Sequence, residues 1–271
     1  GSAVLTCSLS GCDEWLGNTD PSDFLTTDQV WNDNTMVQGV LANLYNDVPK
    51  NGSLDDDVNF SLYDDFMWCG LMNQDVETAR NQMVSYAYDI FRYYDYEYIY
   101  KINQGIESLR TSTLPEADVA VYDAEFRFLR AYTYFQMCIR MGGIPLVTAT
   151  QSYTSGMDIS ELQTPRSTEA EVYEYVYNEC MAVKETLAAN NNVKYVSRAN
   201  KYTALALAGR SMLYAGSIAK YNAAMSNPVH SDLQNGVVGM TGANANGYYE
   251  KALACSEEII NGGVFRLQGV D

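Results

Sequence analysis

Histidine and basic residues are both scarce in this sequence. His230 is the single histidine among 271 residues, and no His-bearing zinc cluster, H-E-x-x-H helix or Ser-His-Asp triad is credible around it. Only 17 Lys and Arg oppose 34 Asp and Glu, which gives a formal net charge of −17. A chain this acidic repels nucleic-acid backbones, so we expect no nucleic-acid partner. The two shortages point away from most hydrolase chemistry and towards binding.

Paired cysteines and long apolar runs are also missing. None of the six cysteines forms a C-x-x-C pair, which excludes zinc ribbons and thioredoxin-like redox sites. Cys138 and Cys180 fall on apolar helical stripes and are predicted to be buried, whereas Cys69 and Cys255 have no assignable partner. No stretch approaches the 18 or more apolar residues of a membrane-spanning helix. A composition of 47% apolar and 19% charged residues is typical of a globular protein.

The N-terminal segment is similar to a bacterial lipoprotein signal. Gly1 and Ser2 look like a vector-derived scar, and the next residues form a short apolar run that ends in Leu-Ser-Gly-Cys12. This ending resembles a lipobox, in which small residues precede the cysteine that becomes acylated. We therefore predict that residues 1–11 are a signal remnant plus scar, that Cys12 carries lipid, and that residues 12–25 are a tether. The alternative is a frayed terminus with an accidental small-small-Cys.

Residues 26–271 are predicted to fold as successive helices. Capping-box patterns at Thr26, Thr113 and Thr168 each precede an apolar stripe of helical spacing. We expect the first helix to run from Thr26 to Val48 in one piece, and a later one to begin at Arg198. The expected stripes are Val30/Val37/Val40/Leu41/Leu44/Val48, Ala124/Phe128/Ala131/Phe135/Cys138, Val172/Val176/Cys180/Val183/Leu187 and Tyr202/Ala206/Gly209/Leu213. Helical spacing of Tyr96/Ile99/Asn103/Ile106/Arg110 favours a helix there over a strand.

Two of these stripes look like copies of one repeat. The stripe beginning at Ala124 maps onto the one beginning at Tyr202 at a constant offset, and both have a small residue at the third position. Each predicted helix is the second member of a pair joined by a short turn. This is the architecture of tetratricopeptide-type repeats, here with long insertions between the units.

The insertions contain the candidate ligand-binding residues. Sugars bind to flat aromatic faces and to carboxylates or amides that hydrogen-bond their hydroxyls. A long acidic segment combines these groups in Trp68, Asn73 and Asp75, and Tyr93 with Tyr94 lies at a helix entrance. We predict these five residues as ligand contacts. The alternative is that the aromatic residues pack in the core between repeats.

The sequence predicts no resident cofactor. Asp55-x-Asp57-x-Asn59 begins like a calcium loop, but Phe60 replaces the required glycine and Phe66 the bidentate glutamate. A solvated acidic loop is the default interpretation, with a looser Ca²⁺ site as the alternative. Two carboxylates would suffice for a glycosidase, but no pair stands out, so we expect a protein that is not an enzyme.

Four stretches together resemble the SusD/RagB family of outer-membrane nutrient-uptake lipoproteins. They are LSGCDEWL at the lipobox, residues 26–45, residues 124–148 with their break at Gly-Gly and exit through proline, and residues 197–216 followed by 248–263. The resemblance implies tetratricopeptide-like repeats that support a second, loop-rich half. Family chains are about twice as long, so this chain looks like an N-terminal portion that lacks the C-terminal half.

The resemblance also implies a function. Members are lipid-anchored at the cell surface over a SusC-like TonB-dependent outer-membrane transporter, bind oligosaccharide or polysaccharide, and pass it on for import. Only Cys12 is carried over from the family, because its binding loops have no fixed motif. Two alternatives stay open: a RagB-like protein that captures peptides, and a tetratricopeptide-type scaffold that binds only protein.

Overall fold

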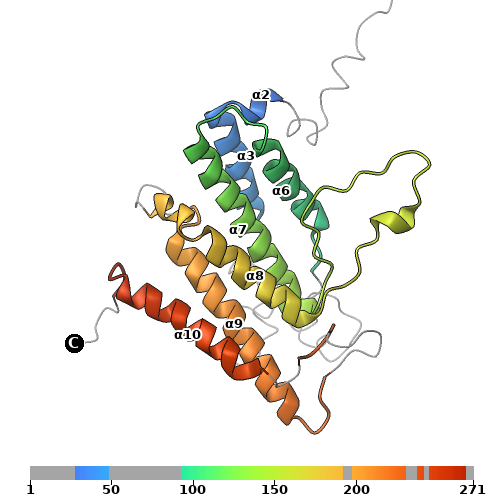
Figure 1. The fold of residues 1–271 in the computed structure, drawn as a ribbon, viewed down its shortest axis with the longest axis vertical. Helices are drawn as coiled ribbons and strands as arrows, with labels where there is room; N and C mark the ends of the chain where they lie inside the picture. Colours follow the sequence, from blue (N-terminus) through green and yellow to red (C-terminus); the bar gives the residue numbers. More distant parts are fainter. Residues whose placement is uncertain (1–27, 49–92, 192–196, 230–236, 241–243, 267–271) are drawn as a thin grey trace, which may run out of the picture.

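The protein is a stack of helices. The computed structural model describes residues 28–48, 93–191, 197–229, 237–240 and 244–266, and every regular element in these ranges is helical (Figure 1). The elements are α2 (Asp28–Trp31), α3 (Asn34–Asp47), α6 (Tyr96–Leu109), α7 (Glu116–Met141), η2 (Ile159–Leu162), α8 (Glu169–Val183), η3 (Thr186–Asn190), α9 (Lys201–Ala224) and α10 (Ala245–Asn261). The mostly α, tetratricopeptide-like fold class is confirmed. None of the described helices is both long and apolar enough to cross a bilayer.

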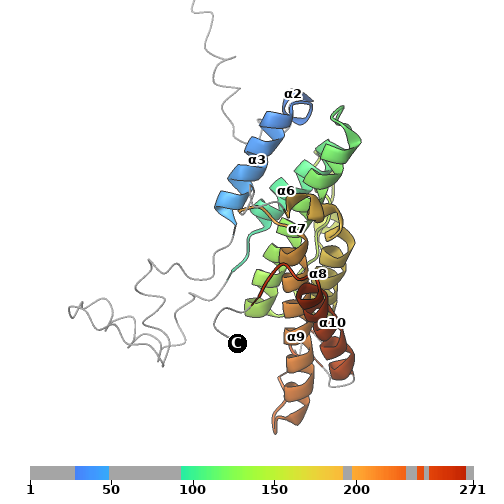
Figure 2. The same cartoon turned by 90° about the vertical axis from the view of Figure 1, so that its left-hand side faces the viewer.

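Consecutive helices pack against one another. α6 contacts α7, α7 contacts α8, α8 contacts α9 and α9 contacts α10, and neighbours run in alternating directions (Figure 1). Each inner helix is therefore covered on two sides. α3 stands to one side of this stack, against α7 (Figure 2). The core is formed along these contacts, and Ile99, Phe126, Tyr134, Tyr173 and Leu205 are each fully buried.

The N-terminal helix is broken where the sequence predicts one piece. α2 ends at Trp31, and α3 begins at Asn34. The Asp33 carboxylate accepts hydrogen bonds from the backbone N–H groups of Thr35 and Met36 at 2.8 and 3.0 Å, and so caps a new helix. Thr26 lies outside the described residues. The predicted stripe from Val30 to Leu44 is nevertheless buried.

The other helix starts follow the sequence to different degrees. The capping box at Thr168 is confirmed, because its hydroxyl and the Glu171 carboxylate bond each other's backbone N–H groups at 3.2 and 2.7 Å. The one at Thr113 is wrong. Its N–H and hydroxyl both donate to Asn32 Oδ1, at 2.7 and 3.0 Å, and α7 begins after Pro115 without a side-chain cap. α9 starts at Lys201 rather than Arg198, because Asn200 and Thr203 form its capping box.

The predicted buried stripe of α9 is wrong. Leu213 is 50% exposed and Ala206 is exposed, whereas the core face consists of Ala204, Leu205, Ala208, Met212, Ala215 and Ala219. The two supposed copies therefore do not bury equivalent faces. α9 lies between α8 and α10, and its many alanines give several possible stripes with similar periodicity. Gly209 does allow a close helix approach as predicted: a Cβ there would lie 3.2 Å from the Cβ of Cys255 on α10.

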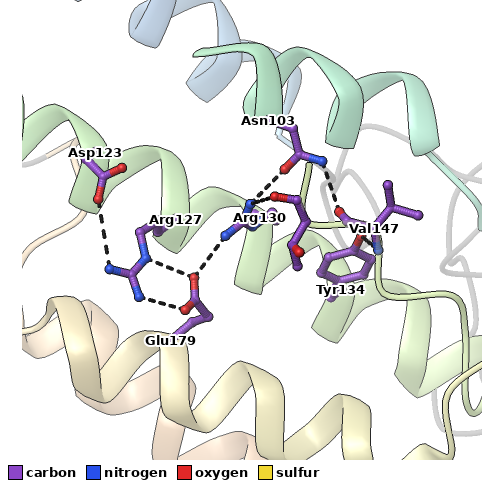
Figure 3. Close-up of polar contacts among 8 residues, drawn as sticks. Asn103, Asp123, Arg127, Arg130, Tyr134, Val147 and Glu179 are labelled. Carbon is purple, nitrogen blue, oxygen red and sulfur yellow. Dashed lines mark hydrogen bonds and ion pairs between the residues drawn. The ribbon is translucent and has the colours of Figure 1, made fainter. Parts of the chain in front are cut away.

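A buried polar network joins α6, α7 and α8 to the extended segment that follows α7 (Figure 3). Arg130 on α7 donates to Asn103 Oδ1 on α6 at 2.7 Å and to the carbonyl of Thr148 at 3.1 Å. The Asn103 amide donates to the carbonyls of Val147 and Ala149 at 3.0 and 3.2 Å. Side chains thus satisfy the carbonyls of the extended segment 147–149, as a neighbouring strand would do in a sheet. They also fix where the following loop leaves the helical stack.

Glu179 on α8 carries the negative charge of this network. It accepts two bonds from Arg127, at 2.7 and 3.0 Å, and one from Arg130 at 3.2 Å (Figure 3). Burial alone would raise the pKa of Glu179, but the bonds and charges of the two arginines together lower it. Asp123 lies farther out, 3.9 Å from Arg127, and burial raises the pKa of its carboxyl. The network therefore holds α8 on α7 through an ionised Glu179.

The predicted break at Gly142-Gly143 is confirmed. Gly142 ends α7 with φ +72°, a conformation that side chains disfavour, and its N–H donates to the Cys138 carbonyl at 2.8 Å. At Gly143 a Cβ would lie 2.0 Å from the carbonyl oxygen of Ser167. Glycine is thus required because the backbone before α8 crosses directly over the end of α7.

Candidate functional site

A hollow of about 540 Å³ opens among α3, α7, α9 and the end of α10. Its size is within the range of about 300–1,000 Å³ that is usual for small-ligand sites. We call it the aromatic hollow; it is lined by Tyr45, Val48, Phe128, Leu129, Tyr132, Ser197, Arg198, Ala199, Asn200, Tyr202, Thr203, Ala206, Ile259 and Phe265.

Helical spacing places the rings of the aromatic hollow. Phe128 and Tyr132 are four residues apart on α7, so they share one face, and their rings stack at 6.5 Å and 24°. Tyr202, in the first turn of α9, meets Phe265 edge to face at 5.1 Å and 90°. Two helices and the chain beyond α10 therefore supply aromatic rings to the lining of one cavity.

A buried ion pair stands behind the rings. Glu125 on α7 is 0% exposed and accepts two bonds from the Arg198 guanidinium, at 2.5 and 2.8 Å. The Tyr45 hydroxyl donates to the same carboxylate at 2.9 Å and accepts from the N–H of Ala199 at 3.0 Å. Burial raises the pKa of Tyr45, so its hydroxyl stays protonated and can donate this bond. This arrangement fixes α3 and the chain before α9 against α7.

The aromatic hollow also has hydrogen-bonding groups at its lining. Ser197, Asn200, Thr203 and the Arg198 guanidinium are donors or acceptors next to the rings. The described lining contains no Asp, Glu, His or Cys, so it does not hold the pair of carboxylates that a glycosidase uses. Apolar rings beside hydrogen-bonding groups are suited to holding a sugar by its C–H surface and its hydroxyls.

Tyr93 and Tyr94 occupy different environments in the structure. Tyr93 is half-buried, with the Arg140 guanidinium 5.5 Å from its ring centroid and its hydroxyl donating to Asp95 at 3.3 Å. Burial raises the pKa of Tyr93, and the nearby Asp95 carboxylate raises it further. Tyr94 is 45% exposed and stacks on Tyr96 at 6.4 Å and 22°. Tyr94 thus exposes a ring that stacks on Tyr96 at the start of α6, whereas the ring of Tyr93 is half-buried. Both ligand contacts stay predictions.

The remaining predicted site residues lie outside the described residues. These are Trp68, Asn73 and Asp75, the lipidation site Cys12, and the acidic segment from Asp55 to Asn59. In the part of the chain that the structure describes, no group of three His, Cys, Asp or Glu side chains is placed to hold a metal ion.

Sequence reasoning missed the aromatic hollow. Phe128 was expected only as a core residue, which it also is at 7% exposure, and Tyr132 was not singled out. The sequence signal that could have indicated the hollow is the four-residue spacing of Phe128 and Tyr132, which places both rings on one face of a helix. The partners Tyr45, Tyr202 and Phe265 are far apart in the chain, so their meeting follows from the packing of α3, α7 and α9.

The fold and the site define a helical-repeat protein with an open, aromatic-lined cavity. A family model described as SusD-like, starch-binding and associating with the outer membrane matches residues 14–213. The match spans well over half of the chain, so the chain belongs to the SusD-like family. Among curated proteins, none matches the chain.

Solved structures show the same fold. A SusD-like protein from Bacteroides fragilis superposes with a TM-score of 0.56 at 24% identity, over 78% of this chain and 41% of that one. The surface glycan-binding protein A from Bacteroides uniformis superposes with a TM-score of 0.56 at 17% identity, over 87% of this chain and 48% of that one. A SusD homolog from Bacteroides thetaiotaomicron superposes with a TM-score of 0.54 at 18% identity, over 92% of this chain and 44% of that one. The chain thus spans less than half the length of these structures.

Proposed function

We propose that this protein is a non-catalytic glycan-binding protein of the cell surface. It captures an oligosaccharide or polysaccharide and delivers it to a SusC-like TonB-dependent transporter in the outer membrane. The observation that carries the proposal is the aromatic hollow in a chain of a family described as starch-binding. The fold is also shared with a surface glycan-binding protein.

The lipid anchor and the location belong to the same proposal. The lipobox-like ending at Cys12 and the family description both support attachment to the outer membrane. Lipid on Cys12 and a tether in residues 12–25 would connect the helical stack to the membrane.

A pure protein-binding scaffold is the rival that the structure allows. Leu213 and Leu253 are 50% and 58% exposed on α9 and α10, and such apolar side chains suit a further protein surface. The two functions differ at the aromatic hollow. Glycan binding depends on its stacked rings and on the hydroxyl and amide groups beside them, whereas protein binding through exposed leucines does not. Peptide capture and glycan capture are distinguished by testing polysaccharides and peptides as ligands.

The test is affinity electrophoresis of the soluble chain, starting after Cys12, against plant, host and microbial polysaccharides, with a mixed peptide library as a separate competitor. Retardation by a polysaccharide is expected. Tyr132→Ala should reduce it severalfold, because it removes one of the two stacked rings against which the apolar face of a sugar would lie. Tyr153→Ala is the control, since Tyr153 is 60% exposed on the loop after α7 and is not part of the hollow.

Two outcomes would contradict the proposal. If Tyr132→Ala and Tyr153→Ala are both retarded as strongly as the wild type, the glycan binds elsewhere on the chain. Retardation by no polysaccharide, together with binding of peptides, would favour the peptide-capturing alternative. Tyr94→Ala tests the predicted contact at the entrance of α6 in the same gel.

A further inference from the structure

A second hollow, between α9 and α10, adjoins the aromatic hollow. This second hollow, of about 460 Å³, is lined by Leu205, Ala206, Gly209, Arg210, Leu213, Tyr249, Ala252, Leu253, Ser256 and Ile259. It shares Ala206 and Ile259 with the aromatic hollow. A ligand longer than one sugar ring could therefore extend from one hollow into the other.

The charge of this joint surface is opposite to that of the chain. The lining of the two hollows contains Arg198 and Arg210 and, within the described residues, no carboxylate. The chain as a whole has twice as many acidic as basic residues and a formal net charge of −17. Arg198 is matched by Glu125 behind it, whereas no carboxylate among the described residues pairs with Arg210 in this way.

Arg210 is held in place by aromatic rings rather than by an acid. Its guanidinium lies 5.7 Å from the ring centroids of both Phe135 and Tyr214, which themselves meet edge to face at 5.5 Å. The residue is exposed, and in the part of the chain described by the structure it forms no ion pair with a carboxylate. Ring faces orient a guanidinium without neutralising it, so its hydrogen-bond donors remain available.

The position of Arg210 relates it to the aromatic hollow. It lies one helical turn beyond Ala206 on α9, a rise of about 6 Å, and Ala206 lines both hollows. The positive charge of Arg210 also acts on Tyr132: burial raises the pKa of Tyr132, and the charges of Arg210 and Arg140 oppose this rise. Arg210 therefore lines the hollow that adjoins the one containing Tyr132.

We propose that the saccharide bound here is acidic, a uronic-acid polymer whose carboxylate pairs with Arg210 while a neighbouring ring lies in the aromatic hollow. This inference rests on the proposed glycan-binding function. The planar guanidinium matches a carboxylate with two parallel hydrogen bonds. Charges farther than about 8 Å from the bound carboxylate are largely screened at physiological ionic strength, so the charges nearest to it determine whether it binds.

The test is calorimetric titration with short oligomers of polygalacturonate, alginate and hyaluronan, each compared with its carboxyl-reduced neutral form. We expect one acidic oligomer to bind at least tenfold more tightly than its reduced form. Arg210→Gln should remove that preference, and Arg210→Lys should restore part of it. Lys220→Gln is the matched control, because it removes one positive charge from an exposed residue of the same helix outside both hollows.

The outcomes separate this inference from the function on which it rests. Equal binding of acidic and reduced oligomers, or binding of neutral polysaccharides alone, would overturn the acidic ligand and leave glycan binding intact. An acidic preference that survives Arg210→Gln would overturn the role of Arg210. Binding of no saccharide in either test would contradict the proposed function itself, and thermal melting confirms that each variant is folded.

Discussion

Tyr45 on α3 and Glu125 on α7 are joined by a 2.9 Å hydrogen bond, although 80 residues separate them in the chain. The same carboxylate accepts two bonds from Arg198, so one acidic side chain ties α3, α7 and the start of α9 together. Because the aromatic hollow lies among these three helices, its shape depends on this carboxylate.

Glu125→Gln should destabilise the protein by about 3 kcal/mol, because it removes the buried charge that accepts two bonds from Arg198 and one from Tyr45. The measurement is the urea midpoint at pH 7. Glu250→Gln is the control, since Glu250 is exposed on α10 and should change stability by less than about 0.5 kcal/mol. Equal midpoints for the two variants would show that the ion pair does not hold α3 and α9 to α7.

Glu179 should make the stability depend on pH in the acid range. Its pKa in the folded protein lies below the unfolded value of about 4.3. Its contribution is therefore fully present above that value and is lost as the pH falls through the folded pKa. The difference in unfolding free energy between wild type and Glu179→Gln should thus be largest above about pH 5 and shrink below about pH 4.

Urea titrations from pH 3 to 7 measure this difference. Glu250→Gln should show a small, nearly constant difference across the range. A Glu179→Gln difference that grows as the pH falls would mean that Glu179 is not held ionised by Arg127 and Arg130.

Gly143→Ala should destabilise the protein by more than about 2 kcal/mol. The new methyl group would lie 2.0 Å from the Ser167 carbonyl oxygen, and this neighbour is backbone that cannot rotate away. Gly39→Ala is the matched control, because nothing lies within 4 Å of a Cβ at this position in α3. It should leave stability unchanged or raise it by up to about 1 kcal/mol. Similar losses in both variants would contradict the close crossing of α7 and the chain before α8.

Cys12→Ala should release the protein from membranes when it is made with its signal segment in a bacterium that processes lipoproteins. Removing the thiol removes the acylation site. Cys7→Ala is the control, because Cys7 precedes the predicted cleavage point and should leave membrane retention unchanged. Fractionation followed by immunoblotting measures both. Retention of the Cys12→Ala protein would refute the lipid anchor.

The sequence by itself determined most local features of this protein. The side chains of Thr168 and Glu171 set the start of α8, and Gly142-Gly143 sets the end of α7, because both act through neighbouring backbone groups. The buried stripes of α3, α7 and α8 follow from helical spacing. Family membership, too, follows from residues distributed along the chain.

Only the tertiary structure decided which faces meet. α9 carries small apolar residues on several faces, so its periodicity did not show that Leu205 and Met212 are buried while Leu213 is exposed. The start of α7 differed from its local pattern because Asn32, far away in the chain, bonds Thr113. The aromatic hollow arises in the same way: Tyr45, Phe128, Tyr202 and Phe265 form one cavity because helix packing, which is non-local, brings them together.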